Sequence, residues 1–447
     1  MNKQALIEQC YDRIAKYERD LNAFITLRDK KTVLAELTQA QQSSSPLSGL
    51  PYLLKDAYVT SGIQTTAGSN ILKGFIPTYD ATVYSKLKKA GAILLGKMNM
   101  DAWGHGSSTE NTDFGATHNP WDLTRVAGGS GGGPGAAISA GFASFAIGED
   151  TGGSIRNPAA WTNTTALKVT YGRVSRYGAI PYVSSFDTVG PVTKTVEECA
   201  VILREIAGVD PYDGTSSPEP VPDYVKGLEQ SLRGLTLGIP TEMYGPGLDP
   251  ETKISIMTAS KEFEKLGVKI IEVSLPIAEI GLAAYYLMAP SETSSNLGRY
   301  DGIRYGQGRD NFTDETIRRI LIGTYALSAG YYDAYYRQAQ KVRTLLIQAY
   351  AKVLQQCDAI IMPVNPTLPP KIGELMSDPL TLYLADIYTT SINPVGVPSL
   401  ALPAGFSKSG LPIGMQLVGD KFSEPLLLSL GHQYQQVTDW HTRSPEL

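Results

Sequence analysis

The segment RVAGGSGGGPGAAISAGFASFAIGEDTGGSIR, residues 125–156, is rich in glycine and serine. Glycine-dense turns lose much backbone entropy on folding, so a globular chain uses them where its backbone must approach another group closely. We therefore take this segment as the centre of a functional site. Its residues fit three chemistries to different degrees: phosphate binding, a nucleophilic serine turn, and a site built from two serines and a distant lysine.

Two common glycine motifs fit the segment only in part. The spacing Gly131-x-Gly133 loosely matches a dinucleotide-binding fingerprint, but the preceding NPWDLTRVA predicts no strand and no Gly-Lys-Ser/Thr follows. Residues 128–132 (GGSGG) match the G-x-S-x-G turn of hydrolases, which needs a preceding strand and a later acid and histidine. We expect the chain's histidines to be ordinary surface or loop residues: His105, His118, His432 and His441.

The third chemistry is supported by three separate motifs, LPYLLKDAYVTSG, RVAGGSGGGPGAA and GEDTGGSIRNPAA. With these motifs in this order, the chain resembles the amidase signature family, whose members share a serine–cis-serine–lysine triad. The resemblance implies that Lys55 is the base, that Ser130 is the bridging serine, held by a cis peptide bond, and that Ser154 is the nucleophile. A glycine-rich packing turn without chemistry is the structural alternative.

Residue chemistry is compatible with these roles. A serine hydroxyl is a weak nucleophile and needs a base within hydrogen-bond reach. Lys55 lies among Leu53, Leu54 and Ala57, and burial disfavours the charged form of an amine. Asp56 would oppose this effect, but neighbouring side chains on a strand point to opposite faces. We therefore expect Lys55 and Asp56 to have different surroundings.

The residues just before Ser154 suggest how a reaction intermediate is stabilised. Tetrahedral intermediates of acyl transfer need an oxyanion hole. The resemblance implies that the N–H groups of Thr151, Gly152 and Gly153 provide it. Arg156, two residues beyond the serine, is expected to be structural rather than catalytic.

Two features depart from the family pattern. The family usually has two serines in GGSSGG, whereas this chain has Gly131 at the second position. The missing hydroxyl is expected to loosen this loop. The segment 304–318 is shorter than in most relatives, which leaves the structure of that loop open.

A closer resemblance is to one branch of the family, the A subunits of the glutamine-dependent aspartyl/glutamyl-tRNA amidotransferases. It rests above all on the run IGTYALSAGYYDAYY. The resemblance implies that Arg319 binds the carboxylate of glutamine, that Asp386 binds its ammonium group, and that Tyr285 contacts the substrate. Free glutamine carries one positive and one negative group, so a fixed cation and a fixed anion suit it.

This branch also implies partners. The chain would hydrolyse glutamine and pass ammonia to subunits B and C of a heterotrimer. The partner would hold the mischarged tRNA and activate its carboxylate with ATP and magnesium, while this chain itself would bind no cofactor or metal. The sequence leaves open Glu-tRNA(Gln) or Asp-tRNA(Asn) as the final acceptor. A stand-alone amidase for another small amide, and a scaffold subunit with a degraded triad, are the alternatives.

Composition limits the class of protein. The 447 residues are 42% hydrophobic and 19% charged, which is typical of a globular chain. The net charge of -5 disfavours binding nucleic acid without a partner. Without a signal peptide or an apolar membrane span, a cytoplasmic location is expected. The three separated cysteines predict free thiols in a reducing compartment.

Alternating strand and helix patterns predict a single α/β amidase domain over residues 1–447, with a mixed central sheet covered by helices on both faces. The Pro- and Ser-rich segment 209–222 is predicted to be a surface loop or the seam between two halves. Strands are expected at 235–240, 269–276, 359–364, 398–405 and 414–419. Helices are expected at 3–16, 195–207, 250–266, 331–356 and 424–437.

Overall fold

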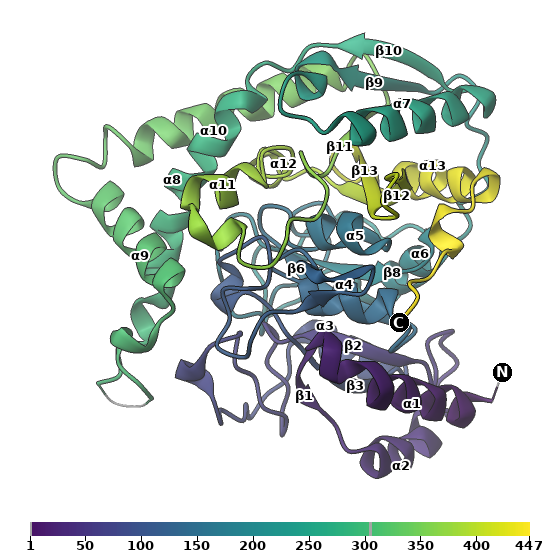
Figure 1. Cartoon of the computed structure of the whole chain (residues 1–447), viewed down its shortest axis with the longest axis vertical. Coiled ribbons are helices and arrows are strands. Elements are labelled where there is room, and N and C mark those ends of the chain that lie inside the picture. Colours follow the sequence, from purple (N-terminus) through teal and green to yellow (C-terminus); the bar gives the residue numbers. More distant parts are fainter. Residues whose placement is uncertain (1, 304–305) are drawn as a thin grey trace.

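One mixed β-sheet runs through the computed structural model, which describes residues 2–303 and 306–447 (Figure 1). Its eleven described strands follow the order β1-β3-β2-β6-β8-β7-β12-β13-β11-β9-β10. The strands are β1 (Phe24–Leu27), β2 (Pro51–Lys55), β3 (Ile93–Met98), β6 (Phe145–Asp150), β7 (Thr165–Lys168), β8 (Thr188–Thr193), β9 (Thr236–Pro240), β10 (Lys269–Val273), β11 (Ala359–Pro363), β12 (Ser399–Phe406) and β13 (Pro412–Gly419). Parallel pairs join β3, β2 and β6 on one side and β11, β9 and β10 on the other, whereas the central pairs and the edge pair of β1 with β3 are antiparallel. The prediction of an α/β fold with a mixed sheet is confirmed.

Helices cover both faces of this sheet. Tyr52 and Leu54 of β2 belong to one hydrophobic cluster, together with residues of α6 and α13, whereas Leu53 belongs to a second cluster with residues of α1 and α4. Because side chains alternate along a strand, these clusters lie on opposite faces. The helices are α1 (Lys3–Leu21), α2 (Lys30–Ala40), α3 (Thr82–Lys89), α4 (Gly132–Ser139), α5 (Arg156–Thr162), α6 (Val196–Ile206), α7 (Pro250–Lys265), α8 (Ala278–Asn296), α9 (Asp314–Leu327), α10 (Tyr336–Val353), α11 (Pro379–Leu384), α12 (Ile392–Val395) and α13 (Glu424–Val437).

The elements expected from periodicity are present. The hairpin expected at 398–405 and 414–419 is the antiparallel pair β12 and β13. The segment 209–222 is a mostly exposed loop between α6 and β9, and strands from both sides of it belong to the same sheet. In Figure 1 the N-terminal strands lie at the bottom and β9 and β10 at the top, with this continuous sheet between them.

The prediction of no strand in NPWDLTRVA is wrong. Asp122–Val126 forms β5, which pairs with β4 (His118–Asn119) in a separate two-stranded sheet. Leu123 and Thr124 of this strand are exposed, so its sequence lacks the alternation that reveals a half-buried strand. Because β5 lies outside the main sheet, it does not supply the parallel unit that a dinucleotide-binding fingerprint requires.

Two of the histidines expected at surface or loop positions are buried: His105, which does lie in a loop, and His432, which lies in helix α13. The ring nitrogens of His105 lie 3.1 Å from the hydroxyl of Thr316 and 3.2 Å from that of Thr293. Burial, with Arg319 nearby, holds the pKa of His105 well below its usual value. His105 is buried because α8 and α9 pack over the turn that follows β3. Local sequence does not reveal this burial, since the contact joins segments that are far apart in the chain.

The three cysteines are free, as expected, and all three are also buried. Their thiols lie in different places, at Cys10, Cys199 and Cys357. Among the described residues, no helix combines the length and the apolar character that crossing a lipid bilayer requires.

Candidate active site

Lys55 and Ser130 meet in the interior of the protein. Lys55 ends β2 and is fully buried, and its Nζ donates a hydrogen bond of 2.8 Å to Ser130 Oγ. Ser130 lies in the glycine loop between β5 and α4 and is also fully buried. The Gly129–Ser130 peptide bond is cis, as the family resemblance implies. The two residues expected to exchange a proton are therefore in direct contact.

Ser154 lies in the turn that joins β6 to α5. Its side chain is nearly buried, with 7% of the residue exposed. The N–H of Gly131 donates a hydrogen bond of 3.0 Å to the carbonyl oxygen of Ser154. The loop that carries Ser130 and the turn that carries Ser154 are therefore joined through their backbones.

Gly131 permits this close approach. A Cβ atom at this position would lie 2.7 Å from the Ser154 carbonyl oxygen, which is closer than real Cβ contacts allow. A loosened loop stays a prediction, although a backbone hydrogen bond holds the loop at the position where the family usually has a second serine. In this chain a side chain at residue 131 would push apart the two segments that carry Ser130 and Ser154.

A buried ion pair fixes the turn before Ser154. Arg156 donates two hydrogen bonds to Asp150, each of 3.0 Å, and both side chains are fully buried. Arg156 also contacts Asn393 and Gln416. Burial alone would raise the pKa of Asp150. Arg156 and nearby hydrogen-bond donors outweigh this effect and hold that pKa well below its usual range. This arrangement fits the structural role expected for Arg156.

The three proposed oxyanion-hole residues differ in their contacts. The N–H of Gly153 donates to the Asp150 carboxylate at 2.9 Å, so it is already engaged. The side chain of Thr151 contacts the carboxylates of Glu149 and Asp187. In the part of the chain that the structure describes, the N–H of Gly152 has no hydrogen-bond acceptor. The oxyanion hole stays a prediction, and its geometry rests on Thr151 and Gly152 rather than on Gly153.

Arg319 lies in α9 and is 2% exposed. Its Nε donates to Glu315 at 2.7 Å, and its Nη1 donates to the hydroxyl of Tyr182 at 2.5 Å. Its Nη2 is buried without a hydrogen-bond partner among the described residues. A buried donor without a partner is costly, and a guanidinium N–H is well suited to a carboxylate. The arrangement can therefore accept a carboxylate group.

Asp386 follows α11 and is also buried. Its Oδ2 accepts hydrogen bonds from Ser107 (2.5 Å) and from the hydroxyl of Tyr286 (3.1 Å). Burial raises the pKa of Asp386 to about 7. The Tyr286 ring lies 5.3 Å from the guanidinium carbon of Arg319, so one tyrosine contacts both the cation and the anion.

Tyr285 lies against the turn of the predicted nucleophile. A Cβ atom on Gly152 would lie 2.6 Å from the Tyr285 hydroxyl, and the tyrosine is buried. Tyr285 therefore faces the predicted oxyanion turn, while the adjacent Tyr286 faces Arg319 and Asp386. Both tyrosines contact the candidate site, and they do so in different ways.

Sequence analysis missed several residues of this site. Glu149 stands in the quoted motif GEDTGGS, yet its contact with Lys55 becomes visible only in the fold. Tyr286 could have been found from its position beside Tyr285. Glu315 lies four residues before Arg319 and Thr389 three residues after Asp386, so their positions gave a local signal, whereas Ser107 and Tyr182 come from other segments.

The short segment 304–318 lies only partly in the described structure. Residues 304 and 305 fall outside it, and the remainder passes through a 3₁₀ turn at Arg309–Asn311 into α9. The position of Arg319 in α9 is described in full. Within residues 2–303 and 306–447, no three His, Cys, Asp or Glu side chains group closely enough to hold a metal ion.

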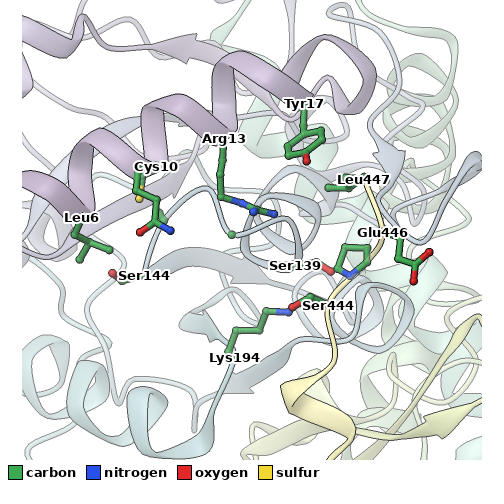
Figure 2. Close-up of a pocket in the computed structure, with 14 residues that line it drawn as sticks. Leu6, Cys10, Arg13, Tyr17, Ser139, Ser144, Lys194, Ser444, Glu446 and Leu447 are labelled. Atoms are coloured by element: carbon green, nitrogen blue, oxygen red, sulfur yellow. The ribbon is translucent and has the colours of Figure 1, made fainter. Parts of the chain in front are cut away.

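A separate pocket of about 530 Å³ lies between α1 and residues 444–447 (Figure 2). Its lining includes Cys10, Arg13 and Lys194, and it contains none of the residues predicted for catalysis. It is therefore distinct from the candidate active site.

A buried lysine in contact with one serine, near the turn that carries a second serine, is the arrangement expected of a serine–lysine amidase site. The chain belongs to the amidase family, whose model, described as Amidase, matches residues 5–428. This match spans the three motifs and the segments that carry Arg319 and Asp386.

Curated relatives are similar along almost the whole chain. The A subunit of the glutamyl-tRNA(Gln) amidotransferase from Desulfatibacillum aliphaticivorans is 47% identical, and the match covers 100% of this chain and 96% of that relative. The corresponding protein from Geobacter metallireducens is 48% identical, with coverages of 96% and 93%.

Solved structures are similar in fold to this chain. The crystal structure of the A subunit of glutamyl-tRNA(Gln) amidotransferase from Thermotoga maritima matches with a TM-score of 0.82 and 38% identity, covering 96% of this chain and 90% of its own. A 6-aminohexanoate cyclic dimer hydrolase matches with a TM-score of 0.91 and 26% identity, covering 100% and 95%.

Proposed function

We propose that this chain is the glutaminase subunit of a tRNA-dependent amidotransferase. The observation that carries the proposal is the pair of buried, opposite charges at Arg319 and Asp386, with a guanidinium nitrogen left without a partner among the described residues. Free glutamine carries the two complementary groups. The similarity to curated A subunits over nearly the full chain supports the same function.

The proposed reaction begins at Ser154. Its Oγ attacks the side-chain amide carbon of glutamine, Ser130 takes up the proton, and Ser130 passes its own proton to the amine of Lys55. The 2.8 Å distance between Lys55 Nζ and Ser130 Oγ supports direct transfer. The N–H groups of Thr151 and Gly152 would stabilise the oxyanion. The proton then returns to the leaving ammonia, and water hydrolyses the acyl-enzyme through the same relay.

We assign the remaining chemistry to partners. Subunits B and C would complete a heterotrimer in the cytoplasm. The partner would hold the mischarged tRNA, bind ATP and magnesium, and use the ammonia to convert Glu-tRNA(Gln), Asp-tRNA(Asn) or both. The acidic net charge of -5 supports tRNA binding by a partner rather than by this chain.

The test is reconstitution. The chain is produced alone and with subunits B and C, and ammonia release from glutamine and from propionamide is measured in each case. We expect a strong preference for glutamine in the complex, and amidation of mischarged tRNA that depends on both glutamine and ATP. Equal turnover of the two amides, with no amidation of tRNA, would contradict the proposal.

A second candidate is a stand-alone amidase that acts on another small amide. The specific observation in its favour is the similarity to the 6-aminohexanoate cyclic dimer hydrolase, whose fold match covers all of this chain. The propionamide measurement distinguishes this candidate from the first, because a stand-alone enzyme for uncharged amides has no use for Arg319 and Asp386.

A further inference from the structure

Glu149 contacts the predicted base of the triad. Its Oε2 lies 2.8 Å from Lys55 Nζ, and its backbone carbonyl oxygen lies 3.3 Å from the same nitrogen. The Lys55 side chain is 0% exposed and that of Glu149 is 4% exposed. Glu149, unlike Lys55, forms part of neither the relay nor the substrate clamp described above.

The contacts of Lys55 match the number of hydrogen bonds that its ammonium group can donate. An ammonium group donates three hydrogen bonds, and Lys55 Nζ has three acceptors: Ser130 Oγ, Glu149 Oε2 and Glu149 O. A free amine has two N–H groups and one lone pair. With both N–H groups held by Glu149, the lone pair faces Ser130 Oγ, which is the orientation that accepts its proton.

Further acidic groups face this pair. Thr151 donates to Asp187 at 2.6 Å and contacts Glu149, so its hydroxyl lies between two carboxylates. Burial, reinforced by Glu149, raises the pKa of Asp187 to about 8. Asp101 faces Lys55 from the turn after β3, and burial raises its pKa to about 7. Neither Asp187 nor Asp101 forms a hydrogen bond with Lys55, so among the described residues Glu149 is the carboxylate in direct contact with the lysine.

The other charged groups near this network are paired or distant from Lys55. Asp56 forms an ion pair with Lys97 at 2.9 Å. The hydroxyl of Tyr58 donates to the carbonyl oxygen of Gly148, and burial, together with the carboxylates of Glu149 and Asp187, raises its pKa well above its usual value. Arg176 lies close enough to Asp187 to lower its pKa, and it forms an ion pair with Asp213 at 4.0 Å.

We propose that Glu149 is a positioning residue of the catalytic site. It holds two N–H groups of Lys55, so that the lone pair of the free amine points toward Ser130. It also stabilises the ammonium that forms when Ser130 delivers its proton. The inference rests on the triad of the proposed function, but not on glutamine as the substrate. A carboxylate beside Lys55 assists proton uptake during the reaction, and removing its charge is expected to change how the labelling of Ser154 depends on pH.

The test uses Glu149→Gln, which keeps an acceptor oxygen and removes the charge. The rate at which a fluorophosphonate labels Ser154 is measured from pH 6 to pH 10, alone and in the complex with subunits B and C, and glutamine hydrolysis is measured beside it. We expect the plateau rate at high pH to fall about tenfold or more. We also expect the acid limb of the profile to move about one unit or more to lower pH.

Glu424→Gln is the matched control, because Glu424 is equally buried but accepts a hydrogen bond from the backbone N–H of Thr170, in another part of the protein. Its pH profile should remain that of the wild type. An unchanged acid limb in Glu149→Gln, or an equal shift in Glu424→Gln, would overturn the assignment.

Two further outcomes distinguish the role of Glu149 from a folding defect and from a failure of the proposed function. If Glu149→Gln does not fold, Glu149→Asp replaces it, because the shorter side chain withdraws the carboxylate from Lys55; a labelling rate within about twofold of the wild type would then overturn the proposal. If Ser154 is labelled with the expected dependence on Glu149 while glutamine is not hydrolysed, the proposed function fails and the role of Glu149 stands.

Discussion

The hydroxyl of Thr389 donates a hydrogen bond of 2.6 Å to the carbonyl oxygen of Gly152. The same hydroxyl lies 3.1 Å from the carbonyl oxygen of Asp386. One side chain therefore ties the turn before Ser154 to the turn that carries the predicted ammonium-binding residue. The predicted nucleophile turn and the predicted ammonium-binding turn are therefore linked by a contact between residues far apart in the sequence.

Ser154→Ala should lower glutamine hydrolysis by several orders of magnitude, because loss of a triad nucleophile removes the acylation step. Ammonia release by the complex with subunits B and C is the measurement. Glutamine-dependent amidation of tRNA should be lost in parallel, while amidation with added ammonium salts should persist. A variant that kept a tenth of the wild-type activity would rule out Ser154 as the nucleophile.

Lys55→Arg should be nearly as inactive as Lys55→Ala. Arginine keeps the positive charge but does not lose its proton in the accessible pH range. The larger guanidinium must also fit a position with no exposed surface. Hydrolysis rates of both variants are compared after thermal unfolding has shown that each is folded. Substantial activity in Lys55→Arg would mean that the role of the residue is electrostatic and not that of a base.

Arg319→Ala should lower kcat/KM for glutamine about 10- to 150-fold, since a charge-assisted contact is worth about 1.5–3 kcal/mol. Hydrolysis of propionamide, which carries no carboxylate, should stay almost unchanged. Arg318→Ala is the matched control, because this neighbouring side chain is 41% exposed and contacts the same Glu315. Equal losses on both amides would place Arg319 outside the substrate clamp.

The KM for glutamine should rise as the pH falls. The pKa of Asp386 is raised to about 7 by burial, so at pH 8 the carboxylate is charged and at pH 6 it is mostly protonated and neutral. Loss of that charge removes the partner of the substrate ammonium, and KM should increase about tenfold over this interval. The KM for propionamide is the control and should not follow. In Asp386→Asn, the KM for glutamine should be high at both pH values.

Gly131→Ala should impair catalysis, because the added Cβ would lie 2.7 Å from the Ser154 carbonyl oxygen. The two catalytic loops must then separate, and we expect a loss of about 1–3 kcal/mol in unfolding free energy with at least a tenfold lower rate of Ser154 labelling. Gly214→Ala is the control, since no atom lies within 4 Å of a Cβ there. Wild-type unfolding free energy and Ser154 labelling rate in Gly131→Ala would contradict this prediction and show that the loops accommodate the added methyl group.

Much of the fold was accessible from local patterns. The β12–β13 hairpin and the helices α7 and α13 follow periodicities that are complete within short windows. β5 was missed because its exposed residues, Leu123 and Thr124, carry no alternation. β5 pairs with β4 in a hairpin that has no buried face, so the sequence of this hairpin lacks an alternating apolar pattern.

The sequence by itself determined the family and identified Lys55, Ser130 and Ser154 as its candidate catalytic residues. Backbone that passes close to such groups requires glycines, and glycine-rich motifs can be recognised directly in the sequence. Only the tertiary structure decided which charges meet. Glu149 reaches Lys55, and Tyr286 joins Asp386 to Arg319, through contacts between separate segments. The physical reason is that a buried charge needs a partner, and a long chain can supply that partner from almost any position, so local pattern does not reveal it.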